Sequence, residues 1–209
     1  MSDAPLKIKV CGMAEAENLA QLARLKPDYV GFIFYPKSSR YVVGRLSAEA
    51  LDVLPSATKR VGVFVSEKPE TLLALAKEYG LDYVQLHGDE SVEYCQSIRR
   101  QGLKVIKVFR VSTADDLSRI ADYAQCADLF LFDTKTPLYG GCGQEFDWTI
   151  LEQAQVPLPW LISGGISADN IQRACQTGAF AVDLNSRFET APGVKDVPLL
   201  ERCFELIRK

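Results

Sequence analysis

The chain has 209 residues, of which 47% are hydrophobic and 24% charged, and it carries a net charge of −3 at pH 7. This length suffices for one sizeable hydrophobic core and is short for two, so we expect a single domain over residues 1–209. The slightly negative charge provides no basic field for a nucleic acid or an anionic membrane surface, and no apolar run approaches the ~18 residues that a membrane-spanning helix needs.

The cysteines and the first residues indicate the compartment. Six cysteines are widely spaced and form no CxxC pair, a pattern typical of neither a disulfide framework nor a zinc site. The first residues carry no basic segment followed by an apolar run, as a secretory signal would. We therefore expect a reduced, cytoplasmic protein.

Eight short runs rich in Val, Ile, Leu and Phe alternate with helical patterns along the chain. We predict strands at residues 6–11, 29–34, 60–65, 83–87, 104–109, 129–133, 159–163 and 179–184. The runs are almost continuously hydrophobic, as expected for parallel strands covered on both faces. Their spacing is that of compact βα units, and the α/β pattern predicts a single (β/α)8 TIM barrel. An open, doubly wound sheet is the alternative, although no GxGxxG motif follows the first strand.

The segments between the predicted strands carry helix signals. Leu19 and Leu22 lie on one face of the first predicted helix. Pro69 is suited to the first turn of a later helix, and Gly80 and Gly102 stand where helices are expected to end.

In a barrel of this kind the active site lies at the carboxyl ends of the strands, so we looked for reactive side chains there. The first strand ends at Cys11, followed by a glycine and a strand-to-helix turn, where a helix N-terminus would lower the thiol pKa from ~8.5. The sixth strand ends at Asp133, which as a general acid needs a pKa raised by roughly 3 units, a shift that burial beside Phe130 and Phe132 would favour. The ordinary structural explanations are a small buried side chain for the thiol and a turn cap for the carboxylate.

The loops after the second and fourth strands carry further candidates. Arg40 is a candidate clamp for a substrate carboxylate, because a guanidinium donates two parallel hydrogen bonds, and Lys37 is a less geometrically selective alternative. His87, the only histidine, follows the fourth strand. A lone histidine is more often a structural hydrogen-bonding group than a catalyst, and it makes a site with several histidine ligands impossible, so we expect no metal and no cofactor.

The last two strands end in a pattern typical of a phosphate site. Gly164 and Gly165 follow the seventh strand, before a helix expected to open at residues 167–170. Glycines let backbone N–H groups approach an anion, and a helix N-terminus favours negative charge. After the eighth strand come Asp183, Ser186 and a cation. The two segments stand at the strand ends where such barrels commonly bind phosphate.

These motifs, in this order, resemble those of the phosphoribosylanthranilate isomerase family, and the resemblance spans most of the chain. The matching segments are residues 9–12, 31–41, 84–88, 132–134, 140–143, 146–148, 163–166 and 183–186. The resemblance implies an isomerase of tryptophan biosynthesis that carries out an Amadori rearrangement on a small phosphorylated substrate.

The resemblance also implies a role for each residue. Asp133 would protonate the furanose ring oxygen, and Cys11, as thiolate, would remove the proton from C2 of the sugar. Arg40 would hold the anthranilate carboxylate, His87 would line the pocket, and Asp183 would lie near the sugar. The phosphate would rest on backbone amides around Gly164, Gly165 and Ser186.

The chain departs from the family pattern at two positions. Arg187 replaces a glycine after the eighth strand, which could shift the phosphate contact or add charge to it, and Cys142 replaces a threonine in the glycine-rich loop 134–143, which we expect to act as a lid. The alternatives are another phosphate-binding barrel, of the epimerase or thiamine phosphate synthase type, and a non-catalytic barrel that binds a phosphorylated ligand. We expect a monomer or a homodimer.

Overall fold

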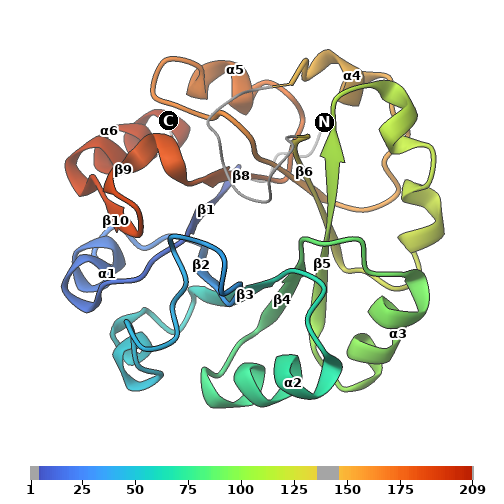
Figure 1. Ribbon diagram of the computed structural model, residues 1–209. Coiled ribbons are helices and arrows are strands. Elements are labelled where there is room, and N and C mark those ends of the chain that lie inside the picture. The colour runs from blue at the N-terminus through green and yellow to red at the C-terminus, as the bar shows by residue number, and fades with distance from the viewer. Residues whose placement is uncertain (1–4, 136–145, 209) are drawn as a thin grey trace.

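Eight parallel strands close into a barrel in the computed structural model, which describes residues 5–135 and 146–208 (Figure 1). The strands are β1 (Lys7–Cys11), β2 (Tyr29–Ile33), β3 (Lys59–Phe64), β4 (Tyr83–Leu86), β5 (Lys104–Val111), β6 (Leu129–Thr134), β7 (Trp160–Ile162) and β8 (Ala181–Leu184). Neighbouring strands pair in chain order, and β8 pairs with β1 to close the ring. The predicted barrel is confirmed, and each predicted strand agrees with the observed one to within two residues.

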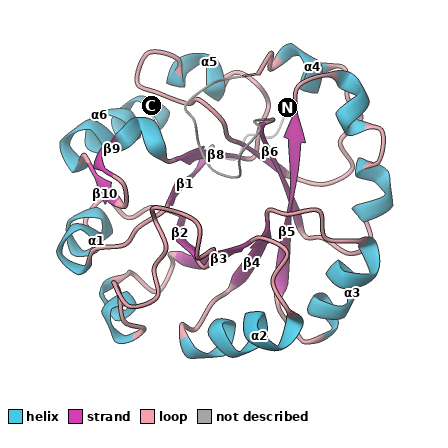
Figure 2. Ribbon diagram, in the orientation of Figure 1, coloured by secondary structure: helices cyan, strands magenta, loops and turns pink. Residues whose placement is uncertain are grey.

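Helices surround the barrel, as Figure 2 shows. The α-helices are α1 (Ala16–Ala23), α2 (Pro69–Glu78), α3 (Val92–Arg100), α4 (Thr149–Glu152), α5 (Ile171–Cys175) and α6 (Val197–Ile207). Short 3₁₀ helices stand after β2, β5 and β8: η1 (Glu49–Val53), η2 (Ala114–Leu117), η3 (Ile120–Tyr123) and η4 (Ser186–Phe188). None of the described helices is long and apolar enough to cross a membrane.

The helix boundaries follow from their sequences. Pro69 occupies the first turn of α2, where its missing N–H costs nothing. Ser91 caps α3, since its hydroxyl accepts a hydrogen bond from the Tyr94 amide at 3.3 Å. Gly80 and Gly102, just past the ends of α2 and α3, adopt positive φ angles of 58° and 87°.

Apolar side chains fill two layers. One cluster lies between the strands and the helices, and a second fills the barrel interior with inward-facing residues of β2 to β8. The interior cluster comprises Tyr29, Val61, Tyr83, Ile106, Val108, Leu129, Leu131, Leu161 and Ala181. Toward the carboxyl ends of the strands the same inward positions carry polar groups, such as Gln85 after Tyr83 and Asp183 after Ala181. The site therefore rests on a packed apolar floor.

A small hairpin follows β8 and was not predicted. Its strands β9 (Glu189–Ala191) and β10 (Val194–Lys195) pair antiparallel, and the hairpin lies between α1 and α6 in Figure 1. The expected lid in loop 134–143, including Cys142, falls almost wholly outside the described residues.

Candidate active site

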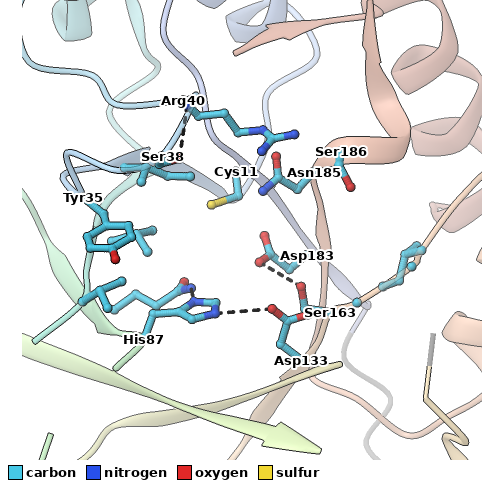
Figure 3. Close-up of a pocket in the computed structure, with 17 residues that line it drawn as sticks. Cys11, Tyr35, Ser38, Arg40, His87, Asp133, Ser163, Asp183, Asn185 and Ser186 are labelled. Carbon is cyan, nitrogen blue, oxygen red and sulfur yellow. Dashed lines mark hydrogen bonds and ion pairs between the residues drawn. The ribbon is translucent and has the colours of Figure 1, made fainter. Parts of the chain in front are cut away.

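All eight residues predicted for the site line one pocket at the carboxyl ends of the strands (Figure 3). They are Cys11, Arg40, His87, Asp133, Gly164, Gly165, Asp183 and Ser186. The side chains of Cys11 and Asp133 point into this pocket from different strands. Lys37 and Arg187 are exposed and are not among the residues that line it.

Cys11 ends β1 and is 3% exposed. Its neighbour in β2 is Gly31, where a Cβ atom would lie 2.6 Å from the Cys11 sulfur. Glycine at this position therefore makes room for the thiol.

The expected effect of a helix N-terminus on Cys11 is wrong. Helix α1 begins only at Ala16, and burial raises the pKa of the Cys11 thiol. The ammonium groups of Lys9 and Lys195 oppose this effect, while the Asp183 carboxylate adds to it. Buried lysines thus provide the charge that could favour a thiolate here.

A buried ion pair lies next to Cys11. The Lys9 ammonium donates a 2.8 Å hydrogen bond to one Asp183 carboxylate oxygen, and the Ser163 hydroxyl lies 3.4 Å from the other. Burial raises the pKa of Asp183, and the Lys9 ammonium opposes that shift. The Asp183 side chain is 5% exposed, and it reaches the pocket between Cys11 and Asp133 (Figure 3).

Asp133 is held at the end of β6 by contacts from two sides. Its Oδ1 accepts a 2.8 Å hydrogen bond from the Thr134 amide, and its Oδ2 lies 3.4 Å from His87 Nε2. On the other side of the imidazole, Nδ1 lies 3.2 Å from Gln85 Nε2, and the buried Gln85 Oε1 has no hydrogen-bond partner among the described residues. His87 therefore orients the carboxyl group, and the free amide oxygen offers an acceptor beside it.

Arg40 lines the pocket, but its guanidinium is already paired with a carboxylate. Its Nε and Nη2 bind the Glu189 carboxylate at 2.6–3.0 Å. Lys195 shares the same carboxylate, since its Nζ lies 2.7 Å from Glu189 Oε1 and 2.9 Å from Asn185 Oδ1. Two cations thus share one carboxylate, which leaves an excess positive charge near the pocket.

The two glycines after β7 have positive φ angles, 80° at Gly164 and 71° at Gly165. The Asn170 side chain holds their turn, because it accepts from the Ser167 amide at 2.8 Å and donates to the Gly165 carbonyl at 3.0 Å. Helix α5 begins just beyond, at Ile171, one residue past the segment expected to open it. Ser186 starts the 3₁₀ turn η4, which follows β8, the strand next to β7.

The polar residues of this region that sequence reasoning missed include Lys9, Gln85, Glu189 and Lys195. Strand alternation could have found Lys9 and Gln85, because each stands two residues before a predicted site residue and so shares its inward face. Glu189 and Lys195 come from the hairpin, whose signal is the Pro192–Gly193 dipeptide.

This arrangement is suited to moving protons on an anionic substrate. A carboxyl group and a thiol face one cavity, and an arginine and a glycine turn also line it. Within residues 5–135 and 146–208, no cluster of three or more His, Cys, Asp or Glu side chains is arranged to hold a metal ion.

Comparison with known proteins identifies one family, that of the phosphoribosylanthranilate isomerases. The family model described as "N-(5'phosphoribosyl)anthranilate (PRA) isomerase" matches residues 8–206. The chain is 41% identical over 204 residues to the N-(5'-phosphoribosyl)anthranilate isomerase of Parabacteroides distasonis, covering 96% of this chain and 92% of that protein.

Solved structures agree. Monomers generated from the dimeric phosphoribosylanthranilate isomerase of Thermotoga maritima superpose with a TM-score of 0.82 at 35% identity, covering 97% and 98% of the two chains. A phosphoribosyl anthranilate isomerase in complex with reduced 1-(o-carboxyphenylamino)-1-deoxyribulose 5-phosphate gives a TM-score of 0.82 at 34% identity, covering 96% and 97%.

Proposed function

The chain belongs to the N-(5'-phosphoribosyl)anthranilate isomerase family, and from this premise we propose that Cys11 and Asp133 are the base and the acid of its reaction. The enzyme is an isomerase of tryptophan biosynthesis. It rearranges N-(5-phosphoribosyl)anthranilate to 1-(2-carboxyphenylamino)-1-deoxyribulose 5-phosphate by acid–base catalysis.

Asp133 acts first in this proposal. Its carboxyl group donates a proton to the furanose ring oxygen, the bond from C1 to that oxygen breaks, and the anthranilate nitrogen forms a Schiff base with C1. The contacts from Thr134 and His87 hold the carboxyl group in one orientation for this transfer.

Cys11 acts second. Its thiolate removes the proton from C2 of the sugar, and the electron pair of the broken C–H bond moves toward the protonated Schiff base, giving an enol that tautomerises to the ketone. A thiolate is suited to this step because its pKa can lie near the operating pH.

The anionic ends of the substrate orient the ribose between these two groups. Arg40 binds the anthranilate carboxylate with the donors that Glu189 leaves free. The phosphate rests on the turn of Gly164 and Gly165 and on Ser186. His87 and Asp183 complete the wall around the sugar.

One observation supports this assignment most directly. The buried thiol of Cys11 on β1 and the partly buried carboxyl group of Asp133 on β6 face the same pocket, although they are far apart in the sequence. If Cys11 were only a buried packing residue and Asp133 only a turn cap, their common position in this pocket, beside an arginine and a glycine turn, would have no explanation.

We expect Cys11→Ala and Asp133→Asn each to reduce kcat by about a hundredfold or more, the usual scale for a proton-transfer group. Substrate generated in situ and followed by its fluorescence measures the rate, and circular dichroism verifies that each variant is folded. Glu15→Gln, a substitution at an exposed ion pair with Arg45, serves as the control. Near-normal kcat in a variant removes that residue from the mechanism.

We also propose that residues 1–209 act as one catalytic domain, in the cytoplasm, without a cofactor, as a monomer or a homodimer. The description of the Thermotoga maritima relative as dimeric supports the second possibility. Unchanged activity after treatment with a chelator, and sedimentation of the purified protein, test the cofactor and the assembly.

A further inference from the structure

Lys9 is a buried ammonium that the reaction scheme above does not use. It stands on β1 two residues before Cys11, so both side chains point to the inside of the barrel. Its side chain is 0% exposed, and its Cα is paired in register with that of Asp183 on β8. Its Nζ donates a 2.8 Å hydrogen bond to Asp183.

Stability is a poor explanation for a lysine at this place. Taking an ammonium and a carboxylate out of water costs several kcal/mol per ion, and an apolar pair of similar volume is often as stable or more stable. On β8 the inward position just below Asp183 is apolar, since Ala181 belongs to the cluster that fills the barrel. A charged pair directly below the reactive end of β1 therefore calls for a functional explanation.

The groups that act on Cys11 come from three elements. Burial raises the pKa of its thiol; Lys9 on β1 and Lys195 on β10 lower it, and Asp183 on β8 raises it. Across the pocket, His87 points to Asp133 (Figure 3), and the charges of these two groups act on Asp183.

Of the two lysines, Lys195 has its donors committed. Its Nζ lies within 2.7–3.4 Å of Glu189 Oε1 and of the Asn185 side-chain and backbone oxygens. Glu189, in turn, is shared with Arg40.

Within the part of the chain that the structure describes, the Lys9 ammonium donates one hydrogen bond to an oxygen atom, in the Asp183 carboxylate, and so keeps further N–H groups. The charges of Lys9 and Cys11 also act on each other. Although burial lowers the pKa of Lys9, the charges of Asp183 and Cys11 raise it above its ordinary value, so Lys9 stays an ammonium at neutral pH.

We propose that Lys9 is a positioning residue whose buried ammonium favours the thiolate form of Cys11 against the effect of burial, with Asp183 fixing the ammonium two residues before Cys11 on the inner face of β1. The proposal rests on the proposed role of Cys11 as base. Lys9 does not touch the substrate; it acts through Cys11, and Asp183 balances its charge so that the thiolate remains a base strong enough to take the C2 proton.

The test is the titration of Cys11 in Lys9→Met, a substitution that keeps an unbranched side chain and removes the charge. Alkylation of Cys11 by iodoacetamide, followed by peptide mass spectrometry across a pH series, reports this one thiol among six. We expect its titration to move up by about one pH unit or more, and the ascending limb of the kcat/KM profile to move with it, about tenfold lower activity near neutrality.

Lys107→Met is the matched control. Lys107 is also a buried lysine in an ion pair, 2.8 Å from Glu90, but it stands on β5 and is not among the charges that act on Cys11. It should leave the Cys11 titration where it is in the unmodified chain. An unchanged titration in a folded Lys9→Met variant overturns the proposal.

Asp183→Asn provides a second measurement if Lys9→Met does not fold. Removing the carboxylate while the ammonium stays should move the Cys11 titration down, the opposite direction to Lys9→Met. An upward or absent shift overturns the proposal. The activity of Cys11→Ala separates this outcome from failure of the proposed function: if Cys11→Ala is active, the thiol is not the base, whatever Lys9 does.

Discussion

Arg40 and Glu189 form a bidentate pair that decides how the carboxylate clamp works. The guanidinium is 13% exposed and the Glu189 carboxylate 5%, so the pair is largely shielded from water. In such surroundings a bidentate contact fixes the plane of the guanidinium as well as its place. The remaining donors of Arg40 are therefore oriented before the substrate arrives, which reduces the entropy lost on binding.

We expect Glu189→Gln to raise KM by about tenfold with a smaller change in kcat, because the neutral amide cannot hold the guanidinium by charge-assisted hydrogen bonds. Arg40→Ala should likewise act mainly on KM, since the carboxylate it binds does not react. Steady-state kinetics measures both. A lower KM in Glu189→Gln would mean that Glu189 competes with the substrate for Arg40, contrary to this prediction.

We also expect Glu189→Gln to change how the stability of the fold depends on pH. Burial alone would raise the pKa of Glu189, but hydrogen bonds from Arg40 and the charge of Lys195 hold it below the ordinary value of 4.5. A lowered pKa in the folded state contributes stability above the unfolded pKa, and this stability is lost as the pH falls through the folded value. The difference between the two proteins in thermal unfolding should therefore be full at about pH 7 and should shrink as the pH falls below the unfolded pKa of Glu189.

At the scale of elements, the turn after β7 is packed against the end of β6. Gly164 has a φ of 80°, and a Cβ there would contact the Thr134 hydroxyl and would lie 2.6 Å from the Thr134 amide and 2.9 Å from Asp133 Oδ1. The glycine is therefore required both by its backbone conformation and by the close approach of the strand that carries the proposed acid.

We expect Gly164→Ala to displace Asp133 and to lower kcat by at least tenfold, with a loss of stability of about 1–3 kcal/mol. Gly178→Ala is a matched control, because Gly178 has nearly the same φ, 79°, with no atom within 4 Å of the added Cβ. We expect Gly178→Ala to lower the stability of the fold through its strained backbone conformation but to leave kcat unchanged. Equal kcat in the two variants would contradict the prediction.

Which elements could be predicted depends on how local their signals are. The strands and the residues at their ends were predictable because buried parallel strands are hydrophobic runs and the barrel brings their carboxyl ends together. The hairpin β9–β10 is short and partly polar, and its importance comes from Lys195, whose burial depends on Asn185 and Glu189 folding around it. That Arg40 is paired with Glu189, 149 residues away, depends on tertiary packing that no local pattern reports.

For the whole molecule, a second buried ion pair connects successive units of the barrel. Lys107 on β5 lies 2.8 Å from Glu90 Oε2 and 2.7 Å from the carbonyl of Gly88. Glu90 Oε1 in turn accepts from the amides of Ser66, after β3, and Gly88, after β4. One carboxylate and one ammonium thus tie the ends of β3 and β4 to the middle of β5, next to the loop that begins at His87.

We expect Lys107→Met to destabilise the fold by about 3–5 kcal/mol, because it leaves the Glu90 charge buried without its partner. The double variant Lys107→Met with Glu90→Gln should be more stable than the sum of the single effects, by about 1–3 kcal/mol, since no isolated charge remains. Urea unfolding of the four proteins of this cycle measures the coupling. Strict additivity would mean that the two side chains act independently and that the ends of β3 and β4 and the middle of β5 are held by packing alone.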